Sequence, residues 1–526
     1  MDKSSATTED MPDNLRQNAE AATSWEHSLT TRRALKIYSK AVWWSVVMSI
    51  ALVMEGYDNK LLGTLYAQPA FQKAYGFRQP NGSYQISAPW QSGMGGISGV
   101  TSILGMFLAG YLTERFGFRR TMMAALLSMP PSIFIFFFAP SMEVLAVGNF
   151  LLTFPLGIFQ TVTTVYVAEL MPTRLRPYLT SFYSLVWAVG QLLSAVVLRG
   201  TLNLPAPWAY RVPFALQWLW PVVLIFGAYL APESPWWLVR QNRLAEAEAV
   251  VSRLTSEDME FETGKIVDLM VFTTNHEREI ESSTSYLACF KGTNLRRTII
   301  VIGVYIMQVM TGSLLRSYMT YFFQQAGLPT DQSFNMSIVG LALSVLGVLG
   351  SWVVMTFIGR RTMYLWGIVI SMAFFMAIGG MGVKLRSSPS SALSWAIGSL
   401  LAVDGFVANL LVLPVTFVLV SEIPSSLLRS KSVVVARNSY TVVNILAGTI
   451  TPYMLNPSAW NWGAMTGFFW GGACILGFLF TFFLVPETKD RTTAEVDILF
   501  EKKVSVRKFK DTKVYLSQID EGNGLP

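Results

Sequence analysis

Long apolar runs dominate this sequence and limit what it can fold into. A helix needs roughly 20 apolar residues to cross a bilayer, and twelve runs come close to that length. Only 14% of the 526 residues are charged, against about 25% in soluble domains. We therefore predict an all-α membrane protein with twelve transmembrane helices. The predicted spans are residues 41–66, 92–113, 121–139, 142–170, 178–199, 213–231, 298–323, 335–358, 363–383, 393–421, 432–455 and 463–485.

Three short motifs occur twice, in the same order, in the two halves of the chain. Glu169 and Arg176 are repeated as Glu422 and Arg429, at an offset of 253 residues. Arg119 and Arg120 are repeated as Arg360 and Arg361, at an offset of 241 residues. Glu233 is repeated as Glu487, at an offset of 254 residues. A membrane chain with such a duplication is predicted to form two helical bundles of like topology, with a transport path between them. The predicted division is a cytoplasmic tail 1–40, a six-helix bundle 41–231, a cytoplasmic linker 232–297, a second bundle 298–485 and a cytoplasmic tail 486–526.

Lysine and arginine are concentrated in alternate short loops, and this asymmetry predicts the orientation of a membrane protein. The basic loops precede the first predicted span and follow the second, fourth, eighth, tenth and twelfth. Both termini are therefore expected in the cytoplasm, and we expect a multi-pass protein of the plasma membrane. The net charge of +7 is expected to reflect topology rather than a nucleic-acid partner. Two N-glycosylation sequons, at Asn81 and Asn335, fall on the predicted outer side. Asn335 is expected to lie too near the membrane to be modified.

The sequence has little raw material for catalysis or metal binding. Its two cysteines, Cys289 and Cys474, are too few for a disulfide framework or a metal cage. Both histidines, His27 and His276, lie in polar segments. With no nucleophile–base set and no metal cluster, we expect neither an enzyme nor a cofactor.

An ordered series of motifs resembles the sugar porter family of the major facilitator superfamily, and within it the fungal maltose permeases and α-glucoside:proton symporters. The resemblance covers residues 43–510. The motifs are Glu55-Gly56-Tyr57-Asp58, Gly157-Ile158-Phe159-Gln160-Thr161, Gly190-Gln191, Pro232-Glu233-Ser234-Pro235, Ser421-Glu422-Ile423-Pro424, Pro452-Tyr453-Met454-Leu455-Asn456-Pro457 and Pro486-Glu487-Thr488-Lys489.

This resemblance implies the major facilitator fold, alternating access, and proton-driven uptake of an α-glucoside such as maltose by a monomer. The main alternative is a diverged carrier of another small neutral or weakly anionic metabolite, including efflux of a secondary product. A transport-deficient sugar sensor is a further alternative, and the short tail after Pro486 argues against it.

Four ionisable residues inside predicted spans are candidates for function, because burying charge in a membrane is costly. They are Glu55, Asp58, Arg316 and Asp404. At a rise of about 1.5 Å per residue, Asp58 and Arg316 lie at similar depths, so Arg316 could pair with Asp58 or Glu55. In the family, the Asp at the Asp58 position is the protonation site and its partner is an Arg in the fourth helix, where this chain has Asn149. Arg316 could replace that partner for proton coupling, form a static pair, or anchor an anionic substrate.

A sugar site needs amides for hydroxyl groups and aromatic faces for C–H surfaces. In the seventh predicted span this chain keeps only part of the pattern that hexose carriers have, and the aromatic residue after the proline of the tenth span is Phe rather than Trp. Each buried amide can equally be a contact between helices. The candidate substrate-binding residues are Gln160, Gln191, Gln308, Asn409, Phe417, Tyr440 and Asn444.

The repeated glutamates and arginines fall at the predicted cytoplasmic ends of helices. Such pairs could close the inner side of the transporter and break when it opens. The alternative is that the arginines only set the topology, although this requires no matching glutamates. We call the set the cytoplasmic gate: Glu169, Arg176, Glu422, Arg429, Arg115, Arg119, Arg120, Arg360 and Arg361.

Overall fold

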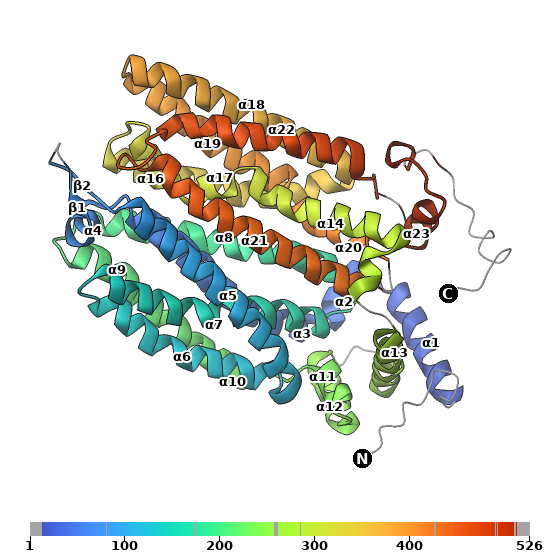
Figure 1. The fold of residues 1–526 in the computed structure, drawn as a ribbon. Coiled ribbons are helices and arrows are strands. Elements are labelled where there is room, and N and C mark those ends of the chain that lie inside the picture. The colour runs from blue at the N-terminus through green and yellow to red at the C-terminus, as the bar shows by residue number, and fades with distance from the viewer. Residues whose placement is uncertain are drawn as a thin grey trace.

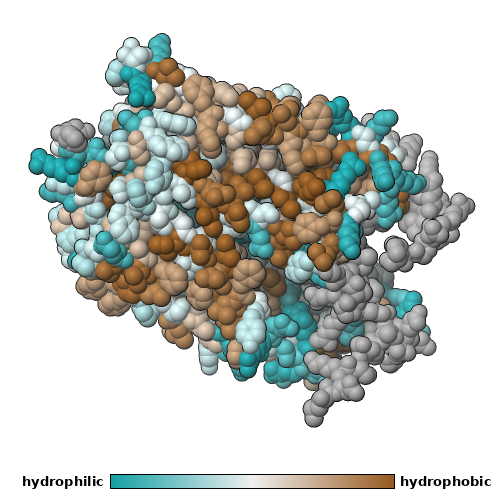
Figure 2. All heavy atoms as spheres, viewed as in Figure 1, coloured by the Kyte–Doolittle hydropathy of each residue, from teal (hydrophilic) through white to brown (hydrophobic). Residues whose placement is uncertain are grey.

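Long helices that run between the two ends of the molecule make up most of the chain. The computed structural model describes residues 13–79, 82–172, 175–256, 261–283, 286–425, 428–489, 491, 493–509 and 512. In this part of the chain, eleven spans are long and apolar enough to cross a membrane, and the bent pair of α2 (Thr31–Ile37) and α3 (Ser39–Leu65) adds a twelfth. Hydrophobic side chains cover the middle of the molecule and hydrophilic ones its two ends (Figure 2). The predicted all-α fold with twelve spans is confirmed.

The first half contains six spans and a small structure at one end. After α3 come α5 (Ala88–Phe116), α6 (Phe118–Phe138), α7 (Met142–Leu170) and α8 (Arg176–Thr201). The sixth span is continuous through α9 (Trp208–Ala215), η2 (Leu216–Trp218) and α10 (Leu219–Leu230). Between α3 and α5 lie α4 (Pro69–Tyr75) and the two-residue antiparallel strands β1 (Phe77–Arg78) and β2 (Tyr84–Gln85).

The second half repeats this arrangement with two broken spans. The seventh span consists of α14 (Gly292–Met310), α15 (Ser313–Ser317) and α16 (Met319–Gln325). It is followed by α17 (Thr330–Phe357), α18 (Arg360–Ser387), α19 (Ser391–Leu411), α20 (Leu413–Glu422), α21 (Arg429–Leu455), η5 (Gly463–Met465) and α22 (Thr466–Leu484).

Both breaks have a local cause. Gly312, between α14 and α15, has a φ of +76°, which a residue with a Cβ rarely adopts. A Cβ at this position would also lie 2.3 Å from the ring of Phe375. Pro414 follows the break between α19 and α20, where its missing N–H interrupts the hydrogen-bond ladder.

Short helices gather at one end of the molecule (Figure 1). They are α1 (Asp13–Ser28), α11 (Pro235–Arg240), α12 (Leu244–Leu254), α13 (Thr263–Ser283), η3 (Tyr286–Phe290), α23 (Thr493–Glu501) and η6 (Val506–Lys508). We call this the inner end, and the opposite end, with α4 and the two strands, the outer end. Within the predicted tail 1–40, α1 packs on α13, and the amide of Asn18 donates to Asp268 of α13 at 2.7 Å. Trp25 of α1 stacks at 4.8 Å on Phe261, which lies just before α13.

Close backbone approaches hold the helices of the first half together. A Cβ at Gly190 in α8 would lie 2.1 Å from the carbonyl oxygen of Val53 in α3, and one at Gly56 would lie 2.2 Å from that of Trp187. Small residues at such crossings allow van der Waals packing in lipid, where the hydrophobic effect between helices is absent. The two halves meet along α5 against α21 and α8 against α17.

Candidate functional site

A cavity of about 350 Å³ lies between the two halves. Its walls come from α3, α5, α6, α7, α8 and η2 of the first half and from α15, α16, α17, α19, α20 and α21 of the second. This volume falls within the range of about 300–1,000 Å³ that is usual for ligand pockets. Five of the candidate substrate-binding residues line it: Gln160, Gln191, Asn409, Tyr440 and Asn444.

The other two candidates, Gln308 and Phe417, lie behind the wall of the cavity. Gln308 is a buried residue of α14. Phe417 in α20 contacts the edges of two tyrosine rings, Tyr183 at 6.3 Å and Tyr305 at 6.4 Å. The Tyr183 contact joins the two halves next to the cavity, so a movement of α20 against α8 would change the shape of the pocket.

Two carboxylates of α3, Glu55 and Asp58, face the cavity. They lie three residues apart and therefore share a face of the helix. The side-chain amide of Gln217 donates a hydrogen bond to Asp58. The amide of Gln160 donates to Glu55 over 3.4 Å and to the hydroxyl of Tyr183 over 3.1 Å. The amide partners hydrogen-bond both carboxylates without neutralising their charge.

Arg316 has a different partner from the two that its depth suggested. Its Nη1 lies 2.6 Å from Oδ2 of Asp404 in α19 and also donates to the backbone oxygen of Thr311. Asp404 is completely buried and Arg316 nearly so. The depth estimate was sound, because Arg316 and Asp58 line the same cavity. Neither of the two possible pairs is formed in the structure, because the break at Gly312 changes the direction in which Arg316 leaves the helix, toward α19.

Two further charged residues of the site, Arg437 and Lys60, were missed from the sequence. Arg437 in α21 lines the cavity with its guanidinium 5.7 Å from the ring of Tyr440, and its charge acts on Glu55 across the two halves. Lys60 in α3 is buried. Both fall inside predicted spans, so the rule that selected Arg316 would have selected them too.

Asn149, which stands where the family has an arginine, ties two helices of the first half together. Its amide donates to the backbone oxygen of Met94 at 2.9 Å and to the hydroxyl of Ser98 at 2.8 Å, both in α5. The position therefore supplies no charge to Asp58. Arg437, from the other half, is a lining cation whose charge acts on Glu55 of α3.

Polar contacts between the halves close the outer end. Lys60, Gln324, Ser92 and Asn456 each donate from a side chain to backbone oxygens of the opposite half, and an ion pair and a tyrosine hydroxyl add to them. We call these contacts the outer gate: Lys60 Nζ to the oxygens of Arg316 and Ser317 (both 2.9 Å), Gln324 to Ala67 (2.7 Å), Ser92 to Thr449 (2.7 Å), Asn456 to Ile86 (2.7 Å), Tyr321 to the side chain of Gln85 (3.2 Å) and Arg199 to Asp331 (3.2 Å).

The two sequons differ in their surroundings. Asn335 is in the second turn of α17, and its side-chain oxygen accepts a hydrogen bond from Arg199 at 2.7 Å. Its amide is thus part of the contact between the halves. Asn81 lies outside the described residues.

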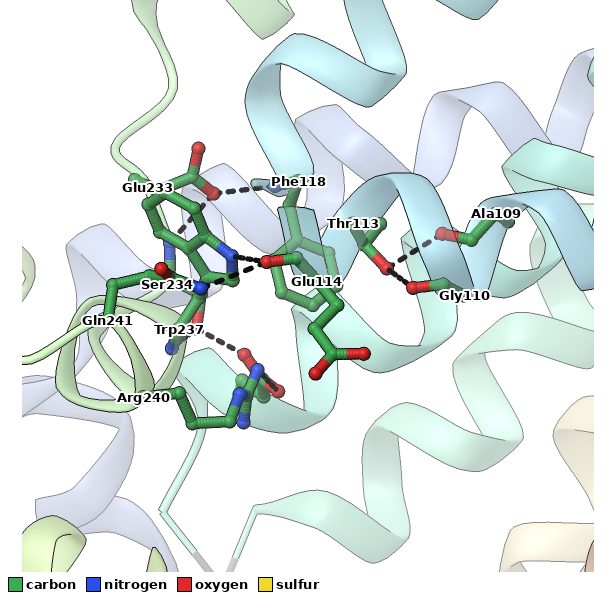
Figure 3. A network of polar contacts seen from close by, with 11 residues as sticks. Ala109, Gly110, Thr113, Glu114, Phe118, Glu233, Ser234, Trp237, Arg240 and Gln241 are labelled. Atoms are coloured by element: carbon green, nitrogen blue, oxygen red, sulfur yellow. Dashed lines mark hydrogen bonds and ion pairs between the residues drawn. The ribbon is translucent and has the colours of Figure 1, made fainter. Parts of the chain in front are cut away.

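At the inner end of the first half, two glutamates form a continuous polar network (Figure 3). Glu233 accepts hydrogen bonds from the backbone N–H groups of Phe118, at 2.8 Å, and Arg119, at the start of α6. Burial raises the pKa of the Glu233 carboxyl, and these N–H donors partly offset the rise. Glu169 accepts a hydrogen bond from the hydroxyl of Ser234 and pairs with Arg240 of α11 at 2.7 Å.

At the inner end of the second half, the same motifs use other partners. Glu422 pairs with Arg360 over 3.5 Å. Glu487 lies against Gly359, where a Cβ would be 2.2 Å from its Oε2. Nη2 of Arg361 donates to the backbone oxygen of Phe482 at 2.8 Å.

The remaining members of the cytoplasmic gate are dispersed. Arg115 donates to the hydroxyl of Tyr111, Arg119 lies 4.9 Å from the ring of Tyr229, and Arg120 is exposed. Arg429 begins α21, and the side chain of Arg176 lies outside the described part of the chain. Of the two inner ion pairs described above, one joins the first half to the linker and the other stays within the second half. Neither joins the two halves, so the structure has a closed outer gate without an inner clasp made of these pairs.

Comparison with known proteins gives consistent matches over almost the whole chain. The model of the sugar (and other) transporter family matches residues 44–500. The general alpha-glucoside permease of Saccharomyces cerevisiae is 39% identical over 507 residues, covering 95% of this chain and 82% of the permease. The maltose permease MAL61 of the same organism is 39% identical over 512 residues, covering 96% of this chain and 83% of the permease. The partially occluded, inward-open xylose transporter XylE from E. coli has a TM-score of 0.70 at 18% identity, covering 86% of this chain and 100% of that one.

Proposed function

The chain belongs to the sugar transporter family of the major facilitator superfamily, and we propose that it takes up an α-glucoside together with a proton by alternating access. The cavity between the halves carries this proposal, because it combines amide groups, tyrosines and two carboxylates that face an arginine of the opposite half. The relatives named for α-glucosides and maltose support the substrate class. A family of permeases also agrees with the expectation that the chain is not an enzyme.

The lining amides suit a sugar that touches both halves. Gln160 and Gln191 belong to the first half, and Asn409 and Asn444 to the second. Each amide offers both a donor and an acceptor to sugar hydroxyl groups. A sugar that bonds to both halves would stabilise the state in which they close around it, and this differential binding links sugar to conformation.

For proton coupling we propose Glu55 and Asp58, with Arg437 as the responsive cation. Glu55 and Arg437 belong to different halves, so their attraction depends on how the halves lie relative to one another. Protonation of Glu55 removes this attraction and changes the relative stability of the two states. Proton occupancy and conformation are therefore linked through a charge pair that crosses the transport path.

The buried charges around the cavity favour a neutral sugar over an anionic metabolite. Arg316 is neutralised by Asp404 within the second half, which supports a static pair and not an anchor for an anion. The three carboxylates near the cavity are balanced by three cations. The six residues are Glu55, Asp58, Asp404, Lys60, Arg316 and Arg437.

Uptake into yeast cells that lack α-glucoside transporters tests this proposal. Labelled maltose and a panel of α-glucosides should accumulate, and a protonophore should abolish the accumulation. In Glu55→Gln and Asp58→Asn, accumulation should be lost while exchange of labelled for unlabelled sugar across the membrane persists. Wild-type protein that reaches the membrane but moves none of these sugars would exclude the proposed substrate class.

We further propose a monomer in the plasma membrane with both termini cytoplasmic and Asn81 glycosylated. The basic residues at the inner end, where α1 and α23 lie, support the orientation. Epitope tags at the two ends should be accessible to antibody only after the cells are permeabilised. Treatment with a glycosidase should increase the electrophoretic mobility of the wild-type chain and leave Asn81→Gln unchanged.

A further inference from the structure

Lys60 is a charged residue of α3 that the transport scheme above leaves without a role. Only 1% of it is exposed, and its Nζ donates to the backbone oxygens of Arg316 and Ser317, each at 2.9 Å. Lys60 belongs to the first half and both acceptors belong to the second. An ammonium group is costly to bury unless it is hydrogen-bonded, so these contacts fix the position of α3 against α15.

The acceptors close a short helix that is anchored in the second half. Gly312 separates α15 from α14, and the last carbonyl groups of a helix lack partners within it. The ion pair of Arg316 with Asp404 fastens α15 to α19. Lys60 therefore contacts a block that moves with the second half.

The backbones of α3 and α15 pack closely around Lys60. A Cβ at Gly63, one turn further along α3, would lie 3.0 Å from the backbone oxygen of Ser317. The rings of Tyr66 and Tyr318 stack at 6.2 Å, and Gln324 donates to the oxygen of Ala67. Lys60 adds a charged donor to the contact between α3 and the α15–α16 region, where the other contacts named here are uncharged.

We propose that Lys60 is a positioning residue for transport, whose ammonium group holds the outer gate closed and is released each time the gate opens. Backbone oxygens of α15 solvate the ammonium in the closed state, and water that enters the outer end solvates it in the open state. The pair of Arg316 and Asp404 keeps α15 attached to the second half. The contact that breaks when the outer gate opens is therefore the one between α3 and α15. The inference rests on the proposed alternating access, but its test requires no sugar.

Thiol labelling of the full chain tests this role, after Cys289 and Cys474 are replaced by alanine. Ala67→Cys reports on the outer gate, because Ala67 is 0% exposed at that end. Ser102→Cys, in the cavity wall, reports on access from the inner side. Lys60→Met removes the Nζ donor from the oxygens of Arg316 and Ser317, a loss that is felt only while the outer gate is closed. We expect the labelling of Ala67→Cys from outside to become about tenfold faster, and that of Ser102→Cys in inside-out vesicles to become slower.

Lys73→Met is the matched control, since Lys73 is an exposed lysine of α4 at the same end. It should change neither rate. Wild-type labelling rates at both cysteines in Lys60→Met would overturn the proposal. Faster labelling at both cysteines would also overturn it, because it would indicate a general loss of packing. Lys60→Gln keeps N–H donors but loses the charge, so it should give an intermediate outer rate. If Lys60→Met does not reach the membrane, unchanged rates in Lys60→Gln overturn the proposal.

Discussion

The two halves of the molecule carry the same inner-end motifs but connect them differently. In the first half, Glu169 pairs with Arg240 of the linker helix α11 at 2.7 Å and is 14% exposed. In the second half, Glu422 pairs with Arg360 over 3.5 Å and is 29% exposed. The duplication thus preserved the positions of the glutamates but not their partners. The comparison indicates that the linker controls the inner end of the first half, whereas the second half controls its own.

The shorter and drier pair should matter most for transport. We expect Glu169→Gln to slow uptake about tenfold while the protein stays in the membrane, because a charge-assisted hydrogen bond contributes about 1.5–3 kcal/mol. Initial rates of sugar uptake at equal surface expression measure this effect. Glu114→Gln is the control, since the Glu114 side chain is exposed at the same end. Unchanged uptake in Glu169→Gln would mean that the arginines at the inner end only determine the membrane topology.

The next prediction tests the identity of the partner. Arg240→Met should reproduce most of the loss seen in Glu169→Gln, about five- to tenfold, and the double variant should be no slower than either single one. Uptake rates of the three variants complete the cycle. If the two single losses of uptake rate multiply in the double variant, Glu169 and Arg240 do not act together. The linker would then not control the inner end of the first half.

Transport should be less sensitive to loss of the ion pair in the second half. Glu422→Gln is expected to slow uptake only about two- to threefold, because a more exposed pair at greater distance contributes about 0.2–1 kcal/mol. The same uptake assay applies, with Arg120→Gln as an exposed control. A loss in Glu422→Gln as large as in Glu169→Gln would remove the difference between the halves.

The smallest expected effect concerns stability and pH. Burial raises the pKa of Glu233 above its ordinary value of 4.5, so the folded state binds the proton more tightly than the unfolded state. Its contribution to stability is complete below pH 4.5 and is lost as the pH rises through the raised pKa. Glu233→Gln should remove this part of the pH dependence, by about 1 kcal/mol or less. Thermal unfolding of purified protein between pH 4 and 8 measures it; identical pH profiles would show that Glu233 does not titrate differently in the two states.

The spans and the duplication could be predicted from the sequence because they depend on local composition. Twenty apolar residues form a spanning helix whatever lies beside them. Partners depend on rotation about helix axes and on the placement of separate elements. Arg316 meets Asp404 because of the backbone at Gly312, and Glu169 meets Arg240 because of where α11 packs. Neither is encoded in spacing along the chain.

Some features of the site can be predicted from the sequence by the same rule that selects Arg316. Lys60 and Arg437 are as conspicuous in their spans as Arg316 is, and a consistent search for charge inside apolar runs finds all three. Five of the seven candidate substrate-binding residues line the cavity. Gln308 and Phe417 do not, and Phe417 packs instead against the rings of Tyr183 and Tyr305.

The charges of α3 also bear on how the protein is made. Glu55, Asp58 and Lys60 all fall in the outer half of α3, the first span of the chain. A charged residue costs up to about 2.5–3.5 kcal/mol on insertion, the value at the helix centre. Such a segment should rest poorly in lipid until α8 has been synthesised and has packed against it through Gly56 and Gly190. We therefore expect nascent chains that stop before α8 to be retained by the insertion machinery, although the first transmembrane segment is complete.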